Sequence, residues 1–142
     1  MATEPKTLHL QIEADARLAA AAGGVIRWLA DAAGLQNDVI AHLQSAVIAA
    51  CSEIFEHLTT THPRLEIFFT RFTDRLEVAL SHRGENSPAV GLDTIAGFAT
   101  GSGGAGTNSE IFSGFDRVQY ETHDGEAVTR LTKYLGHGAR NL

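Results

Sequence analysis

The chain opens with a period-two alternation of apolar and polar residues, which predicts a half-buried strand. The run Leu8-His-Leu-Gln-Ile12 alternates in this way, and successive side chains of a strand point to opposite faces. The following segment changes to helical spacing, which predicts a helix that Asp15 caps and Gly34 ends. Its apolar positions are Leu18, Ala22, Val25, Ile26, Leu29 and Ala33. The pair Gly23-Gly24 inside this helix weakens it by about 1 kcal/mol per glycine relative to alanine, or lets another element approach closely.

A second helix is predicted from Asn37 or Asp38, either of which can cap it, to about Thr60. Pro63 then closes the helix and begins a hairpin. The apolar residues of this helix form one stripe at helical spacing: Val39, Leu43, Val47, Ala50, Ile54 and Leu58.

Two hairpins are predicted further along the chain. The first joins Leu65–Phe72 to Leu76–Ser81 through Thr73-Asp74, and the second joins Arg117–Thr122 to Ala127–Tyr134. The second turn, His123-Asp-Gly125, contains the Asp-Gly pair that favours a tight turn.

The segment 82–108 has no clear periodicity and is rich in glycine and proline, so we expect a flexible lid with a short helix at Leu92–Phe98. Another brief helix is expected at Glu110–Phe115, and residues 136–142 are expected to fray. The order of elements predicts an α+β fold, a two-layer α/β sandwich with helices on one face of a mostly antiparallel, mixed sheet. Residues 1–142 form one domain, since 44% hydrophobic residues suffice for a single core.

Charge and cysteine content narrow the class of protein. Lys plus Arg number 11 against 17 Asp plus Glu, the formal charge is −6, and no run of basic residues occurs. This composition argues against nucleic acid or an anionic membrane as the main partner. The single Cys51 excludes an internal disulfide, and neither a signal peptide nor an apolar stretch of about 18–20 residues is evident. A cytoplasmic protein is expected.

The most distinctive run is Ser45-Ala-Val-Ile-Ala-Ala-Cys-Ser-Glu-Ile-Phe-Glu-His57. It resembles the nucleotide-site helix of the anti-sigma-factor serine kinases, a family of the GHKL (Bergerat-fold) ATPases, which reads roughly A-V-S-E-A-C-T-N-A-V-E-H. The element order from Leu8 to Tyr134 is also that of the family, with a weaker match at Asp74-Arg-Leu-Glu-Val78. The matching positions of the helix are Ala46, Val47, Ala50, Cys51, Glu56 and His57.

The resemblance implies a degenerate catalytic site. The family's glutamate base falls on Ala49, which has no proton acceptor, and its magnesium-binding asparagine falls on Glu53. Glu53 can still supply an oxygen ligand for magnesium, or it is a solvated charge on an exposed helix face. Ser45, Ala49, Glu53 and Glu56 recur on one helix face, which we expect to lie opposite the apolar stripe. In a slipped register, Glu53 is the base and His57 the magnesium ligand.

The family's adenine motif, D-x-G-x-G, falls on His82-Arg-Gly84-Glu-Asn86. The glycine is retained at Gly84, while His82 replaces the aspartate and Asn86 the second glycine. Loss of a charge-assisted hydrogen bond costs about 1.5–3 kcal/mol, so the resemblance implies weakened adenine recognition. Alternatively, His82 is simply a polar residue at a strand end.

The family's phosphate lid is a glycine-rich loop before a helix, and the chain offers Gly101-Ser-Gly-Gly-Ala-Gly106 at that place. Its glycines, Gly101, Gly103, Gly104 and Gly106, let backbone amides contact phosphate, although such a cluster also serves as a flexible linker.

The sequence indicates less specific roles for the remaining candidate residues. Glu53 and His57 are spaced as ligands on one helix face, but no further His or Cys pair completes a zinc set. Cys51 is expected to be a packed small residue rather than a nucleophile, and Trp28 is expected in the core. Some of the phenylalanines are expected to be exposed anchors for a protein partner: Phe68, Phe72, Phe98, Phe112 and Phe115.

Three functions follow from these expectations. The first is an anti-sigma-factor-like partner-switching regulator that binds a sigma factor or an anti-anti-sigma protein, with weak or absent ATP and magnesium binding and no kinase activity. The second is an active ATP-dependent serine kinase of an anti-anti-sigma partner. The third is a structural or scaffold homodimer.

Overall fold

The structure, a computed structural model, describes residues 5–58, 64–83, 114–123 and 125–136. Several expected features lie outside these ranges: the lid beyond residue 83, its helix at Leu92–Phe98, residues 110–113 of the helix expected at Glu110–Phe115, and the tail from residue 137. The described elements are β1 (Lys6–Glu13), α1 (Ala16–Ala32), α2 (Asn37–His57), β2 (Arg64–Arg71), β3 (Arg75–Arg83), β4 (Arg117–His123) and β5 (Glu126–Tyr134).

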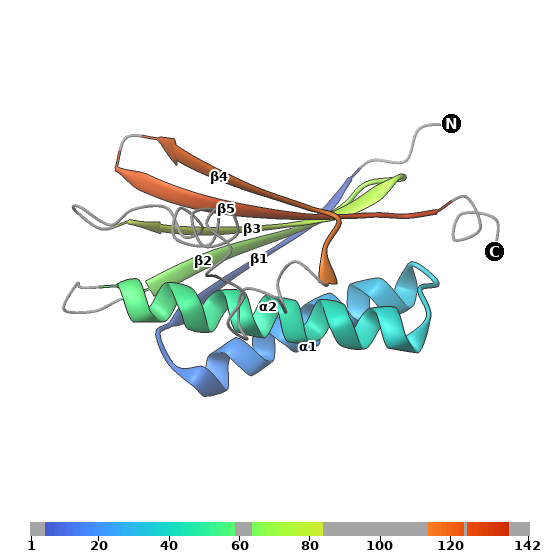
Figure 1. Cartoon of the computed structure of the whole chain (residues 1–142), viewed down its shortest axis with the longest axis horizontal. Coiled ribbons are helices and arrows are strands. Elements are labelled where there is room, and N and C mark those ends of the chain that lie inside the picture. The colour runs from blue at the N-terminus through green and yellow to red at the C-terminus, as the bar shows by residue number, and fades with distance from the viewer. Residues whose placement is uncertain (1–4, 59–63, 84–113, 124, 137–142) are drawn as a thin grey trace, which may run out of the picture.

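The described strands form one sheet, with α1 and α2 packed against one of its faces (Figure 1). The strand order is β1-β2-β3-β5-β4, and every neighbouring pair is antiparallel. The predicted α+β, two-layer architecture is therefore confirmed. The prediction of a mixed sheet is wrong for the described strands, because each joins its neighbour in the antiparallel sense, including β3 with β5.

The register places the apolar positions of neighbouring strands on the face that the helices cover. Ile67 lies opposite Leu80, and Val78 lies opposite Leu131. Directly paired residues share a face of the sheet, so the strands present one continuous apolar surface to the helices. Its fully buried members are Leu65, Ile67, Phe69, Leu76, Val78, Leu80 and Leu131.

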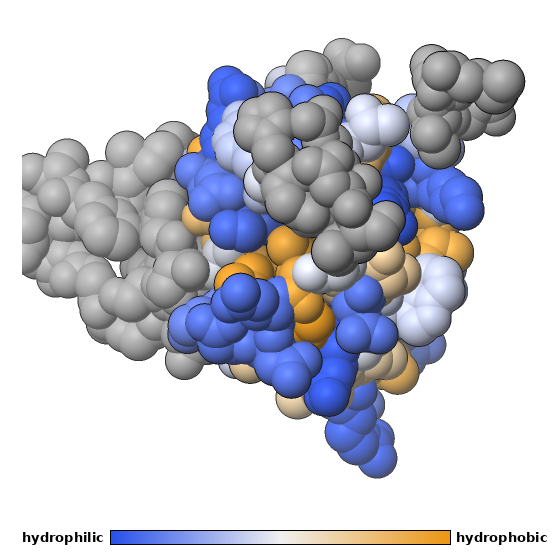
Figure 2. Space-filling view, turned by 90° about the vertical axis from the view of Figure 1, so that its right-hand side faces the viewer, coloured by the Kyte–Doolittle hydropathy of each residue, from blue (hydrophilic) through white to orange (hydrophobic). Residues whose placement is uncertain are grey.

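Some hydrophobic surface is exposed at the end of the molecule that carries the connection between α1 and α2 (Figure 2). Figure 2 shows hydrophobic surface at this end between hydrophilic rims. Leu35, in that connection, and Leu135, just after β5, are half-buried and pack against the core.

The ends of α1 follow the sequence prediction. The Asp15 carboxylate accepts a hydrogen bond from the backbone N–H of Arg17 at 2.9 Å, which caps the first turn. At the other end, Gly34 adopts a positive φ of 83°. The N–H of Leu35 donates to the carbonyl of Ala30 at 3.1 Å, which is the hydrogen bond of a Schellman motif.

The start of α2 differs from the prediction. Gln36 is the capping residue, with extended backbone and no side-chain capping bond, so Asn37 and Asp38 lie in the first turn. The four-residue link from α1 turns at Gly34 and decides where the helix begins, although either polar residue had the chemistry of a cap. The helix ends at His57 rather than Thr60, since Leu58 is already extended.

The apolar stripe of α2 is confirmed as its core face. Leu43, Val47, Ala50 and Ile54 are fully buried, and Cys51 beside them is buried as expected. By length and composition this helix is apolar enough to cross a membrane, with a mean hydropathy of 1.3 over 18 residues. The expectation that no apolar stretch is long enough to span a membrane is therefore wrong. A helix buried in the core of a protein can be equally long and apolar.

Two glycines allow close contacts around α2. A Cβ at Gly23 of α1 would lie 2.8 Å from Ile48 Cγ1, so the two helices touch at this point. A Cβ at Gly114 would lie 2.7 Å from the His42 carbonyl oxygen. The segment before β4 therefore descends from the sheet onto α2 (Figure 1), where Phe115 is buried.

The other face of the sheet carries a network of charged side chains. Arg130 on β5 binds Glu77 on β3 at 3.2 Å and Glu121 on β4 at 3.0 Å. Near the β1 edge, the imidazole of His9 stacks on Phe68, with ring centroids 4.3 Å apart. The predicted polar face is thus present, with Phe68 36% exposed on it.

Two expectations about aromatic residues are wrong. Trp28 was expected in the core and is 64% exposed, because it lies on the face of α1 that points away from the sheet. Phe115 was a candidate for exposure and is only 4% exposed. Phe72 is half-buried, with the guanidinium of Arg75 lying 3.9 Å from its ring centroid.

Candidate functional site

The predicted site face of α2 does not lie opposite the apolar stripe. Ser45 and Glu56 are exposed, but Ala49 is only 7% exposed and belongs to the core. Ala49 follows the buried Ala46 by three positions and precedes the buried Ala50, so helical geometry places it on the flank of the stripe. The predicted position of the base is therefore occupied by a packed methyl group.

Glu53 lies on the same flank, one turn beyond Ala49. Its side chain is half-buried, and its Oε2 atom is fully buried. The carboxylate of Glu53 is therefore not fully solvated.

His82 lies on β3, on the face of the sheet that the helices cover. It follows Leu80 by two positions and pairs in register with Ala127 of β5. The residue is 2% exposed, and neither of its ring nitrogens has a hydrogen-bond partner within the part of the chain that the structure describes. A buried polar group without a partner is uncommon in proteins and costs stability.

The protonation state of His82 follows from this environment. Burial lowers the pKa of His82 below its ordinary value of 6.5, and the nearby His57 lowers it further. The ring is therefore neutral at physiological pH, with one nitrogen as a donor and the other as an acceptor.

The structure places four of the predicted site residues among the described elements. Ala49, Glu53 and His57 lie on successive turns of α2, and His82 lies on the helix-covered face of β3, where His57 is near enough to lower its pKa. The other predicted pocket residues, Gly84, Asn86, Gly101, Gly103, Gly104 and Gly106, lie outside the described residues.

The chemistry of this group is limited. Ala49 cannot accept a proton, and burial raises the pKa of the Cys51 thiol to about 12, so Cys51 is not a nucleophile. Within the described ranges, no three His, Cys, Asp or Glu side chains are placed to hold a metal ion. The carboxylate of Glu53 could supply one ligand group to a magnesium ion. The remaining ligands would have to be phosphate oxygens and water. Neutral His82 could accept one hydrogen bond from an amino group such as that of adenine.

A second surface was missed by the sequence reading. A groove of about 470 Å³ lies between α1 and α2, on the side away from the sheet. Its lining residues are Gly24, Arg27, Trp28, Asp31, Asn37, Ile40, Ala41 and Gln44. The signal for it was present in the sequence, because Gly24, Trp28 and Asp31 fall on the helix face opposite the buried stripe of α1.

Comparison with models of protein families and with curated proteins finds no match to this chain. The likeness to the anti-sigma-factor kinases therefore rests on the residues of α2 and on the order of the elements.

Proposed function

We propose that this chain is a cytoplasmic, partner-switching regulatory domain of the anti-sigma-factor type with a Bergerat-type fold, which acts by binding another protein and does not phosphorylate it. The observation that carries the proposal is the buried Ala49 at the position that matches the family's glutamate base. A kinase of this type needs a carboxylate to take the proton of the attacking serine, and a general base contributes about 10²–10⁴-fold to the rate. The buried methyl group of Ala49 cannot take a proton, so it contributes nothing to the rate in this way.

Three further features support the proposal. The element order and the two-layer architecture are those expected for the family. His82 replaces a charged hydrogen-bond acceptor by a neutral one, which weakens adenine binding. The chain carries a formal charge of −6, and this charge suits a protein partner better than a nucleic acid.

Nucleotide binding separates this proposal from an active kinase. The purified protein is titrated with a fluorescent ATP analogue in the presence of magnesium. We expect no saturation below millimolar nucleotide. Saturation at micromolar nucleotide together with phosphorylation of a partner serine would instead favour the kinase, with Glu53 as its working carboxylate.

Partner capture separates the proposal from a structural scaffold. The tagged chain is used to capture proteins from its native cells, and we expect a sigma factor or a small anti-anti-sigma protein among them. Recovery of neither protein, with the chain folded and soluble, would favour the scaffold.

Restoring the family residues tests the assignment of positions. Glu53→Asn with His82→Asp should recover nucleotide affinity first, because each supplies a ground-state contact worth about 1–3 kcal/mol. Adding Ala49→Glu should then raise turnover rather than affinity, since a base acts in the transition state. If the wild-type chain phosphorylates a partner as fast as the triple variant does, the positions are wrongly assigned.

A further inference from the structure

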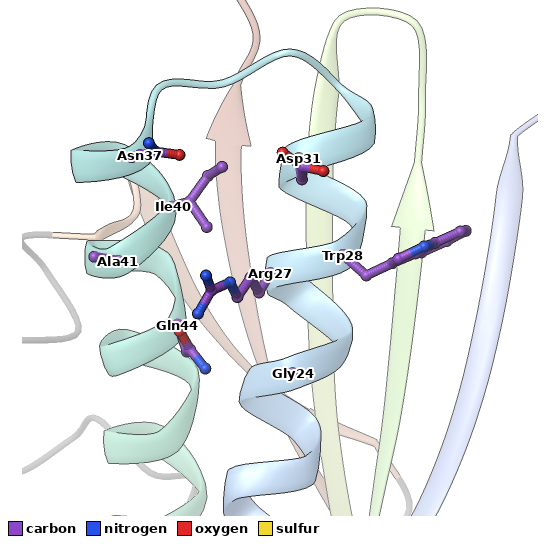
Figure 3. A pocket seen from close by; sticks show the side chains of 8 residues that line it. All are labelled: Gly24, Arg27, Trp28, Asp31, Asn37, Ile40, Ala41 and Gln44. Atoms are coloured by element: carbon purple, nitrogen blue, oxygen red, sulfur yellow. The ribbon is translucent and has the colours of Figure 1, made fainter.

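The groove between α1 and α2 carries two charges that the fold itself does not use. Arg27 and Asp31 both line it, and they are spaced i, i+4 on α1, where opposite charges commonly pair. Neither residue has an ion pair with any described residue. Figure 3 shows Arg27 directed toward the space between the two helices, with Asp31 one turn further along α1. The groove therefore presents a cation and an anion at separate positions.

The carboxylate of Asp31 is poorly placed with respect to its own helix. Asp31 lies in the last turn of α1, which contains no basic residue. Negative charge is unfavourable there, because the last carbonyl groups of a helix carry partial negative charge. A positive charge that approaches from outside is attracted both by the Asp31 carboxylate and by the end of α1. This end of the groove thus favours a cationic group.

A side-chain amide accompanies each of the two charges. Figure 3 shows Gln44 directed toward the same space as Arg27, and Asn37 near the end of the groove where Asp31 lies. A Cβ added at Gly23 would lie 3.1 Å from Gln44 Cγ, so the stem of Gln44 packs against α1 and holds its amide at the groove. An amide can donate a hydrogen bond to a carboxylate or accept one from an ammonium group.

The rest of the groove is apolar and open. The buried Ile40 forms part of its lining, and at Gly24 nothing lies within 4 Å of the position of an added Cβ. Small-molecule sites commonly measure about 300–1,000 Å³ and combine an apolar lining with a few polar groups. The volume of this groove, about 470 Å³, lies in that range.

We propose that the groove binds a small zwitterion of the free amino acid class, with its carboxylate on Arg27 and Gln44 and its ammonium group on Asp31 and Asn37. A simple anion would be repelled by Asp31, and a simple cation would be repelled by Arg27. A molecule that carries both charges matches both ends of the groove, and Ile40 favours an aliphatic side chain on it. This inference does not depend on the regulatory function proposed above, because the groove lies on the side of the helices away from the sheet.

NMR titration of the isotope-labelled protein tests the proposal, with leucine, glutamine and glycine as the probes. We expect saturable binding in the millimolar range, since the groove is open to solvent, and leucine should bind most tightly because of Ile40. The signals that shift should be the side-chain amides of Gln44 and Asn37 and the indole N–H of Trp28, which is the single tryptophan of the chain.

Blocked forms of leucine test the two charges separately. N-acetyl-leucine lacks the ammonium group and leucinamide lacks the carboxylate, so each loses a charge-assisted contact and should bind about tenfold or more weakly than leucine. Arg27→Met should remove the preference for leucine over leucinamide. Asp31→Asn should remove the preference for leucine over N-acetyl-leucine.

Matched controls and a blocking variant complete the experiment. Arg64→Met and Asp38→Asn change exposed charges outside the groove and should leave leucine binding as in the wild type. Gly24→Leu places a side chain in the groove where the fold has no contact. This variant should keep its urea midpoint or raise it, because leucine is the better helix former, and it should lose leucine binding.

Three results would overturn the proposal. The first is the absence of saturable shifts with all three amino acids at tens of millimolar. The second is binding of N-acetyl-leucine or leucinamide to the wild type as tightly as leucine itself. The third is leucine binding that is unchanged in Arg27→Met, in Asp31→Asn or in a folded Gly24→Leu variant, which would place the ligand elsewhere.

Discussion

Gly23 and Gly24 are adjacent in α1 but occupy different environments. An added Cβ would meet Ile48 at the first position and open space at the second. A helical periodicity places neighbouring residues about 100° apart, so one glycine faces α2 and the other faces solvent. The two positions form a natural matched pair.

We predict that Gly23→Ala destabilises the fold by about 1–2 kcal/mol, because the overpacking against Ile48 exceeds the gain in helix propensity. Gly24→Ala should be neutral or stabilise by up to about 1 kcal/mol. Urea denaturation of both variants at one low protein concentration measures the difference. Equal effects at the two positions would contradict the close helix contact.

His82 is expected to make stability depend on pH. Its folded-state pKa lies below the ordinary value of 6.5 because of burial and of His57. The unfolded chain therefore binds a proton in a range where the folded protein does not. Stability from this group is fully present above pH 6.5 and falls as the pH is lowered toward the folded pKa.

We predict that His82→Leu flattens this fall in stability and raises stability at neutral pH by about 1–3 kcal/mol, because it removes two unpaired buried nitrogens. Urea midpoints at a series of pH values provide the measurement. The exposed His42 offers a control, since His42→Gln should leave the pH dependence as in the wild type. An unchanged slope in His82→Leu would show that another group causes it.

Cys51 should be unreactive in the folded protein. Its thiol is buried and its pKa is raised to about 12, so little thiolate exists at neutral pH. We predict that Ellman's reagent modifies it only as fast as the protein opens, and at once in urea. Rapid modification under native conditions would show that the core around α2 opens easily.

At the scale of elements, ion pairs between neighbouring strands stabilise the solvent-facing side of the sheet. Glu77 on β3 receives Arg75 from its own strand at 2.7 Å and Arg130 from β5 at 3.2 Å. The Glu77 side chain is only 14% exposed, so these pairs are less screened than ordinary surface pairs. Arg130 also reaches β4 through Glu121, and it links the last three strands of the sheet.

We predict that Arg130→Met destabilises the fold by about 0.5–1 kcal/mol, since the methionine retains much of the stem but loses both ion pairs. The loss should shrink at high salt, which screens exposed charges. Arg117→Met on β4, where the side chain is exposed, is the control. Thermal unfolding at low and high salt distinguishes the two variants.

At the scale of the whole molecule, the two sides of the helical layer carry different features. The helix-covered face of the sheet holds the apolar core and the buried His82, and Glu53 and His57 lie in the last turns of α2. The outer side of the helical layer carries the groove and Trp28.

Several features of this protein are determined by the sequence itself. The alternation of Leu8, Leu10 and Ile12 predicted β1, and Asp15 and Gly34 marked the ends of α1. The Asp-Gly turn was predicted as well, and Gly125 has the expected positive φ of 80°. These features are local, since caps, turns and periodicity depend on residues only a few positions apart.

Other features were decided only by the tertiary structure. The pairing of β3 with β5 joins strands about 50 residues apart, and no local pattern specifies its antiparallel sense. Helical periodicity showed which residues share a face with Ala49 or Trp28, but long-range packing selected the face that is covered. For that reason Ala49 became part of the core, His82 was buried without a hydrogen-bond partner among the described residues, and Trp28 was left in solvent.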